Sequence, residues 1–276
     1  MTKNNANLEV FAGNVRKNIV KMVYNAKSGH IGGSLSCADI LAVLYNEILN
    51  IPVNWDKDPN FKNRDRFILS KGHASPALYA VLAEKGFFEK NELMTFRKFN
   101  SRLQGHPSLC TKLPGIEVST GSLGQGLSMG VGIALALRLN KIKSKVYVLT
   151  GDGEMQEGSI WEALMNASHQ KLNNIVLIVD KNSLQIDGKT SDVKNIDPLD
   201  KKLSAFNWKV RCINGHNYNE IREALNEAKN AEVPFAIIAD TVKGKGVSFM
   251  ENNHKWHGKA PNDEEYKRAI EELCNV

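Results

Sequence analysis

The chain has 276 residues, of which 42% are hydrophobic, so it is long enough to bury a real core as one large α/β domain or two small ones. The sequence has no apolar run of about 18 residues and the N-terminus lacks the apolar core of a signal peptide, so we expect a cytoplasmic protein that does not enter a membrane. The net charge of +6 comes from scattered lysines without an aromatic-laced basic stripe, which argues against nucleic acid as a partner. The four cysteines are far apart and form no CxxC pair, which predicts free thiols.

Apolar spacing predicts helices and strands in alternation along the chain. In order, we expect a helix at 8–26, a Gly-rich loop at 28–34, a helix capped by Ser36, a polar loop at 51–63, a strand at 66–70, helices at 75–85, 91–99 and 127–140, a strand at 146–149, a helix at 160–167, strands at 175–179 and 208–213, a helix at 219–230, a strand at 234–241 and a helix at 263–273. This order is typical of an α/β fold with a doubly wound, mainly parallel sheet and helices on both faces. Without repeats or an interdomain linker, we expect a single domain over 1–276. Glycine and alanine in 127–140 predict close packing of that helix against a sheet or a second subunit.

The most informative stretch is 145–188, which predicts a strand, a tight turn, a helix and a second strand. Such a unit joins parallel strands by a right-handed crossover, and ligands bind outside the carboxyl ends of the strands. The turns at 151–153 and 180–184 are therefore expected to face one crevice. Asp152 and Asn182 offer it a carboxylate and an amide oxygen, which suit Mg²⁺ or Ca²⁺ with a diphosphate completing the ion's shell.

Other loops repeat this design, with a polar group or a glycine cluster beside a predicted strand or helix. The polar groups are His30, His73 and His106, and the glycine cluster is TGSLGQG at 120–126. A lone loop histidine is more often incidental, and glycine clusters are common at turns. The repetition is what indicates a function, because such turns converge at one edge of a doubly wound sheet.

Together, these loops resemble the amino-terminal half of transketolase, in collinear order over almost the whole chain. The motifs are SGH at 28–30, LSKGHA at 69–74, GHP at 105–107, TGSLGQG at 120–126, GDGEMQEG at 151–158, Asn182 with IDG, KGKGVSFME at 243–251 and HGKAP at 257–261. The spacing from Gly153 to Asn182 is similar to that of the thiamine diphosphate fingerprint. The resemblance implies thiamine diphosphate with Mg²⁺ or Ca²⁺, the metal being held by Asp152, Asn182 and the backbone carbonyl of Leu184.

The resemblance also implies roles for residues in the other loops. Contacts to sugar hydroxyls and proton movement would fall to His30, His106 and His257, because imidazole has an unperturbed pKa near neutrality. Cofactor contacts would come from several segments: His73 and His257 at the diphosphate, Gly121, Ser122 and Leu123 against the rings, the Gly153 amide at phosphate, and Glu157, Asn182 and Ile186. Glu157 is also the carboxylate that family members place at a subunit contact.

A few positions depart from the family's pattern or have no part in it. Ser122 and Ile31 stand where many members have proline, which we expect to alter loop rigidity more than chemistry. We choose His257 over His254 because a glycine follows it. His216 has no role in the pattern, and we expect it to be structural or solvent-facing.

Full-length family members continue into a pyrimidine-binding domain, which supplies the glutamate that activates the cofactor, and a C-terminal domain. The resemblance thus implies the N-terminal subunit of a split transketolase, which works on sugar phosphates in a heterotetramer with two copies of a separate C-terminal subunit. Alternatives are another thiamine diphosphate enzyme, such as 1-deoxyxylulose-5-phosphate synthase or part of a dehydrogenase, a transketolase for an unusual sugar, and a non-catalytic cofactor-binding module. The spread of loop histidines favours a sugar-transferring enzyme over a dehydrogenase or a binding module.

Overall fold

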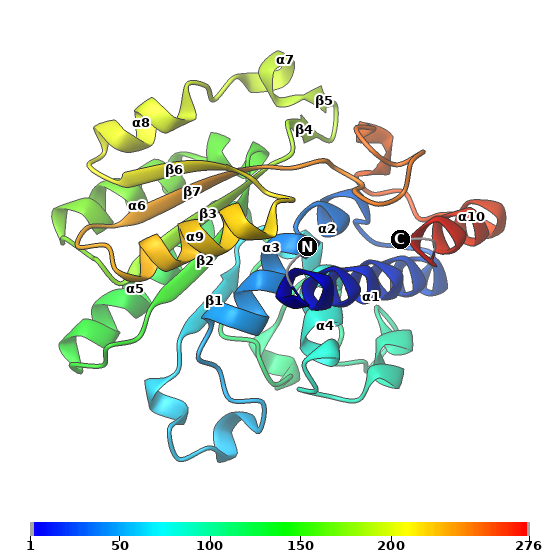
Figure 1. The fold of residues 1–276 in the computed structure, drawn as a ribbon, viewed down its shortest axis with the longest axis horizontal. Helices are drawn as coiled ribbons and strands as arrows, with labels where there is room; N and C mark the ends of the chain where they lie inside the picture. Colours follow the sequence, from blue (N-terminus) through cyan, green and yellow to red (C-terminus); the bar gives the residue numbers. More distant parts are fainter. Residues whose placement is uncertain (1–2, 275–276) are drawn as a thin grey trace.

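A five-stranded parallel sheet runs through the centre of the computed structural model, which describes residues 3–274 (Figure 1). The strand order is β1-β2-β3-β7-β6, with β1 at Arg66–Leu69, β2 at Val146–Gly151, β3 at Ile175–Lys181, β6 at Lys209–Asn214 and β7 at Phe235–Asp240. All four pairings are parallel, so the carboxyl ends of the strands lie at the same edge. The five predicted strands and the predicted parallel α/β architecture are confirmed.

Helices cover both faces of this sheet, and the sheet separates the hydrophobic core into two clusters (Figure 1). The core on one face includes residues of α1 (Lys3–Ala26), α3 (Ala38–Val43), α4 (Ser75–Glu84) and α9 (Tyr218–Lys229), together with α10 (Asp263–Cys274), which packs against α1. The other face packs against α5 (Gln125–Leu139), α6 (Gly158–His169) and α8 (Leu199–Ala205). The predicted helices at 8–26, 75–85, 127–140, 160–167, 219–230 and 263–273 are thereby confirmed.

The strands serve both cores because successive side chains of a strand point to opposite faces. Tyr147 and Leu149 of β2 belong to the first core, and Val146 and Val148 to the second. This explains the continuous apolar runs that mark buried parallel strands. Burying one such side chain contributes roughly 1.5–3 kcal/mol.

Helix α5 approaches the sheet closely through its glycines. A Cβ atom on Gly130 would lie 2.7 Å from Cγ2 of Val148, and one on Gly126 would lie 2.3 Å from Oγ of Ser70. Both distances are too short for real side chains, so these positions require glycine. The small residues of α5 therefore serve packing against the sheet, as the sequence predicted.

The start of the chain differs from expectation at the predicted loop 28–34. Residues Gly32–Ser36 form a short helix, α2, and the predicted cap of the next helix is wrong. Cys37 is the N-cap of α3 and makes no side-chain capping bond. Ser36 is instead fully buried, and its Oγ donates to the Gly33 carbonyl at 3.1 Å and to Oδ2 of Asp180 at 2.5 Å.

The predicted helix at 91–99 is also wrong. This segment forms a 3₁₀ helix at Lys90–Thr95, of which only Leu93 is buried. Arg97 and Asn100 have φ angles of 60° and 59°, which a right-handed helix cannot contain. The predicted loop at 51–63 holds two 3₁₀ turns, Trp55–Lys57 and Phe61–Asn63.

The region after β3 contains elements that apolar periodicity did not reveal. A hairpin of two-residue strands, β4 (Leu184–Gln185) and β5 (Gly188–Lys189), precedes α7 (Thr190–Lys194) and α8. Strands this short contain too few residues to display an alternating pattern. Within residues 3–274, no helix combines the length and apolarity needed to cross a membrane.

Candidate active site

A crevice of about 370 Å³ lies at the carboxyl ends of the parallel strands. The turns after β1, β2, β3 and β7 all line it, together with loops around residues 30, 106, 121 and 257. Of the residues predicted for the site, the crevice is lined by His30, His73, His106, Gly121, Leu123, Asp152, Gly153, Glu157, Asn182, Leu184, Ile186 and His257. Ser122 is exposed and does not line it.

Three histidines from three separate segments form a triangle in this crevice. The ring centroids of His30 and His73 are 5.1 Å apart, those of His30 and His257 are 5.3 Å apart, and those of His73 and His257 are 5.4 Å apart. His30 precedes α2, His73 lies in the 3₁₀ turn after β1, and His257 follows another 3₁₀ turn. The fold therefore brings together side chains that are up to 227 positions apart in the sequence.

Burial keeps these histidines uncharged. It lowers the pKa of His30 to about 4 and that of His257 to about 3, and it takes the pKa of His73 well below its ordinary value. Nearby cations add to the effect, with Arg97 acting on His30 and Lys243 on His257. At neutral pH each ring consequently has one nitrogen that donates and one that accepts, as proton exchange with hydroxyl groups requires.

One ring nitrogen in the triangle is buried without a hydrogen-bond partner among the described residues. Nδ1 of His30 is buried, and no atom of residues 3–274 forms a hydrogen bond with it. The His30 ring also lies near Gly258, where a Cβ atom would be 3.9 Å from its Nε2. Buried polar atoms are normally paired, so an orphan in a crevice indicates a ligand-binding position.

Asp152 ties the turn after β2 to the turn after β3. Its side chain is almost completely buried, with Oδ1 accepting from the Gly153 amide at 2.9 Å and Oδ2 from the Ser183 amide at 2.7 Å. Burial and the neighbouring Asp180 raise the pKa of Asp152 to about 6. Because each carboxylate oxygen has two lone pairs, acceptor capacity remains for a cation.

The other predicted metal-binding atoms lie in the adjoining turn. Oδ1 of Asn182 accepts from the Leu184 amide at 3.2 Å, and the Leu184 carbonyl accepts from Nζ of Lys243 at 3.1 Å. All three predicted ligand atoms are hard oxygens, a donor set that fits Mg²⁺. Among the described residues no three His, Cys, Asp or Glu side chains cluster for metal binding, so a cation here would depend on the mixed carboxylate, amide and carbonyl set.

A glycine loop forms the wall of the crevice on the side of β1. Gly121 has φ of 149°, and a Cβ atom there would lie 3.0 Å from Cδ2 of His106. Oγ1 of Thr120 donates to the Leu69 carbonyl at 2.8 Å, and the Gly124 amide donates to Oε1 of Glu154 at 2.9 Å. These bonds hold the loop between strand β1 and the turn after β2.

Two buried lysines of the crevice were not predicted as site residues. Lys71 pairs with Asp180 at 2.5 Å, and Lys243 lies 2.9 Å from Nδ1 of His257. Burial, together with the positive charge of Lys71, lowers the pKa of Lys243 to about 8. The Lys243 side chain is 1% exposed. The sequence signal that could have identified Lys71 and Lys243 as site residues was their position inside the SKGHA and KGKG motifs.

His216 and His254 lie outside the crevice. Nδ1 of His216 lies 2.7 Å from Oδ2 of Asp39, and its Nε2 accepts from the Val242 amide at 2.9 Å. This bridge makes His216 a structural residue, as expected. His254 begins the 3₁₀ turn before His257 and does not line the crevice.

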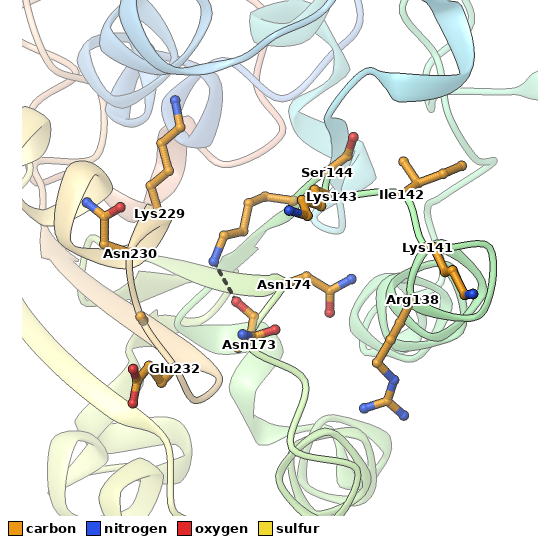
Figure 2. Close-up of a pocket in the computed structure, with 12 residues that line it drawn as sticks. Arg138, Lys141, Ile142, Lys143, Ser144, Asn173, Asn174, Lys229, Asn230 and Glu232 are labelled. Atoms are coloured by element: carbon orange, nitrogen blue, oxygen red, sulfur yellow. Dashed lines mark hydrogen bonds between the residues drawn. The ribbon is translucent and has the colours of Figure 1, made fainter.

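A larger hollow of about 550 Å³ lies at the opposite edge of the sheet, near the amino ends of β2, β3 and β7 (Figure 2). Its lining includes several cations, but Figure 2 shows Arg138 and Lys229 pointing in opposite directions. Nζ of Lys145 donates to the Asn173 carbonyl at 2.6 Å, and Arg138 donates to the Gln170 carbonyl at 2.5 Å. The cations therefore do not converge on a shared ligand position.

A parallel sheet whose carboxyl edge opens into a crevice lined by neutral histidines and polar oxygens is typical of an α/β domain that binds a ligand there. The family described as transketolase, thiamine diphosphate binding domain, matches residues 9–274. The chain is 44% identical over 267 residues to one of the subunits of the apulose-4-phosphate transketolase of Phocaeicola vulgatus, covering 96% of this chain and 93% of that protein. It is 40% identical over 274 residues to the 6-deoxy-6-sulfo-D-fructose transketolase subunit SqwG of a Clostridium species, covering 99% and 98%.

Solved structures lead to the same family. Transketolase of Campylobacter jejuni superposes with a TM-score of 0.89 at 38% identity, over 97% of this chain and 42% of that one. Human transketolase is 40% identical over 263 residues, which are 95% of this chain and 41% of the human protein. The chain therefore belongs to the transketolase family, has its thiamine diphosphate-binding fold, and spans about two fifths of these longer relatives.

We expect Lys71→Met to destabilise the fold by about 3–5 kcal/mol, because it leaves the Asp180 carboxylate buried without its counter-charge. Lys27→Met is the matched control, since the side chains of Lys27 and its partner Asp263 are 61% and 76% exposed, and losing this pair should cost far less free energy. Urea unfolding of both variants measures the difference. Equal free energies of unfolding would contradict the importance of the buried pair.

The lowered histidine pKa values also predict how stability depends on pH. Between about pH 6.5 and pH 4 the histidine rings bind protons in the unfolded chain but stay neutral in the folded chain. The contribution of these rings to the free energy of unfolding is therefore complete above this pH range and is lost as the pH falls through it. We expect His73→Asn to lose less stability than the wild type between pH 7 and pH 4. The exposed His169→Asn should follow the wild-type curve, and parallel curves for all three proteins would refute the expectation.

Proposed function

We propose that this chain is the N-terminal subunit of a split transketolase, transferring a two-carbon ketol group reversibly from a ketose phosphate to an aldose phosphate. The observation that carries the proposal is the triangle of neutral histidines in a crevice that Asp152, Asn182 and Leu184 also line, in a domain of this family. Thiamine diphosphate supplies the carbanion chemistry when bound. The residues of the chain would bind, orient and exchange protons.

The cation-binding part of the proposal rests on the donor set. Asp152, Asn182 and the Leu184 carbonyl would hold Mg²⁺ or Ca²⁺, and the Gly153 amide and His73 would face the diphosphate. Lys243 donates to the Leu184 carbonyl, so its positive charge already lies where an anionic tail would arrive. Gly121 and Leu123 would contact the cofactor rings together with Ile186, whose side chain is 65% exposed at the crevice.

The substrate-binding part rests on the histidines. His30 and His257 are buried enough to stay neutral, and His30 has a free buried nitrogen. His106 lines the same crevice and lies beside Gly121. Neutral imidazoles in these positions would donate to and accept from sugar hydroxyls and move protons at the reacting carbons.

The partner proposal rests on relatives whose length the chain nearly equals. The relatives from Phocaeicola vulgatus and Actinobacillus succinogenes are both named as one lettered subunit of an apulose-4-phosphate transketolase, and the chain covers 93% and 95% of them. We propose a separate C-terminal subunit that supplies the glutamate for the aminopyrimidine, with Glu157 at the subunit contact and two copies of each subunit. The single domain proposed for 1–276 would then be the diphosphate-binding half of the enzyme.

A second candidate is a transketolase devoted to an unusual sugar. The names of the most similar relatives described here refer to apulose 4-phosphate and to 6-deoxy-6-sulfo-D-fructose. Both candidates use the same crevice, so the choice between them lies in the substrate. Assaying the two-subunit enzyme with common sugar phosphates, apulose 4-phosphate and the sulfosugar distinguishes them.

We expect Asp152→Ala to abolish metal-dependent binding of thiamine diphosphate, because the diphosphate would lose the cation that offsets its charge in a partly buried site. Asp192→Ala removes an exposed carboxylate from α7 and should bind normally. Calorimetric titration of thiamine diphosphate with and without Mg²⁺ measures both. Unchanged affinity in the Asp152 variant would refute the metal assignment.

We expect the purified chain to show little ketol transfer by itself, and addition of the C-terminal subunit to restore it. The reason is that the glutamate needed to activate the cofactor is proposed to lie on the partner. A coupled assay with xylulose 5-phosphate and ribose 5-phosphate checks this, with each of the two proteins by itself as a control. High activity of this chain without its partner would overturn the split-enzyme proposal.

A further inference from the structure

A completely buried ion pair contacts Asn182, one of the residues of the proposed cation site. Asp180 ends the buried part of β3 with 0% exposure, and its Oδ2 lies 2.5 Å from Nζ of Lys71, the residue that follows β1 by two positions. The same ammonium donates to the Gly33 carbonyl at 2.7 Å. Buried ion pairs are often no more stabilising than apolar pairs, so this one needs a further explanation.

The Asp180 carboxylate accepts hydrogen bonds from four donors. Oδ2 accepts from Lys71, from Ser36 at 2.5 Å and from Nδ2 of Asn182 at 3.3 Å, and Oδ1 accepts from Thr241. With three donors, Oδ2, the oxygen that faces Asn182, has no lone pair left for a cation.

The bond to Asn182 decides which way the amide of that residue faces. A carboxylate paired with an ammonium only accepts hydrogen bonds, so the NH₂ group of the amide must point toward Asp180. The amide oxygen then points away, toward the crevice-lining turn, where it accepts from the Leu184 amide. A flipped amide would place its oxygen against the carboxylate and its NH₂ toward any cation.

We propose that Asp180, held in place by Lys71, is a positioning residue that fixes the Asn182 amide with its oxygen available to the cation. This inference rests on the proposed function, because it assigns a purpose to Asn182 as a metal ligand. Lys71 also neutralises the second carboxylate of the site, which leaves Asp152 as the carboxylate that binds the ion. Outer-shell partners of this kind typically change metal affinity 10- to 100-fold when removed.

The test replaces the pair as a whole. In Lys71→Met/Asp180→Leu the buried charges become apolar side chains of similar size, which cores often tolerate, and Asn182 loses its acceptor. We expect the full-length variant to need at least about 10-fold more Mg²⁺ for half-maximal binding of thiamine diphosphate, measured by calorimetry without any substrate. Thr241→Val is the control, because it removes a donor from Oδ1 and leaves the bond to Asn182 intact. A folded double variant with the wild-type Mg²⁺ requirement would overturn the proposal.

Two further variants keep the test decisive. If the double variant does not fold, Lys71→Met/Asp180→Asn is used, because a neutral amide at 180 keeps the size of Asp180 but no longer dictates which end of the Asn182 amide faces it. We expect weaker Mg²⁺ binding than in the wild type, and equal or tighter binding would overturn the proposal. Asp152→Ala is measured in parallel. If this variant keeps Mg²⁺-dependent binding of the cofactor, the proposed metal site itself is wrong. If it loses that binding while the double variant keeps the wild-type Mg²⁺ requirement, only the positioning role of Asp180 is contradicted.

Discussion

The parallel pairing of the central strands is the constraint on which the rest of this structure depends. Because every strand points the same way, the turns after β1, β2, β3 and β7 open at one edge of the sheet. Backbone groups at that edge have no further ladder partners, so the turns bond to one another through side chains. Asp152 bonds to the Ser183 amide, and Asp180 bonds to donors from α2, the turn after β1 and the segment after β7. Hydrogen bonds between the turns at this edge of the sheet thus hold the crevice together.

Burial then sets the chemistry of the groups that this edge brings together. Desolvation disfavours charge, which lowers the pKa values of His30, His73 and His257 and raises that of Asp152 to about 6. The pKa values of the two buried lysines shift in opposite directions because the lysines have different partners. Lys71 has the Asp180 carboxylate beside it, which outweighs burial and raises its pKa, whereas Lys243 has a histidine and a carbonyl and its pKa falls to about 8. One crevice consequently holds neutral imidazole rings beside charged side chains.

Much of this arrangement was predictable because it is encoded locally. The apolar runs at 146–149 and 175–179 predicted strands, the glycines of 151–153 predicted the turn after the first of them, and the glycines of 120–126 predicted a turn before the helix at 127–140. Elements without a local signal were missed or misjudged. The two-residue strands β4 and β5 are too short to show alternation, and the 91–99 segment has helical composition but adopts positive φ at Arg97. Ser36 has the residue type of a helix cap, yet a carboxylate 144 positions away takes its hydroxyl.

The sequence by itself determined the order of elements, the parallel α/β class and the identities of the polar residues at the turns, since each depends on neighbours in the chain. Only the tertiary structure decided which of those residues meet, how deeply each is buried and which of their atoms stay free. The triangle of histidines, the Lys71 and Asp180 pair and the orientation of the Asn182 amide all involve distant segments. Burial and hydrogen bonding depend on these contacts in space, which spacing along a single chain does not specify.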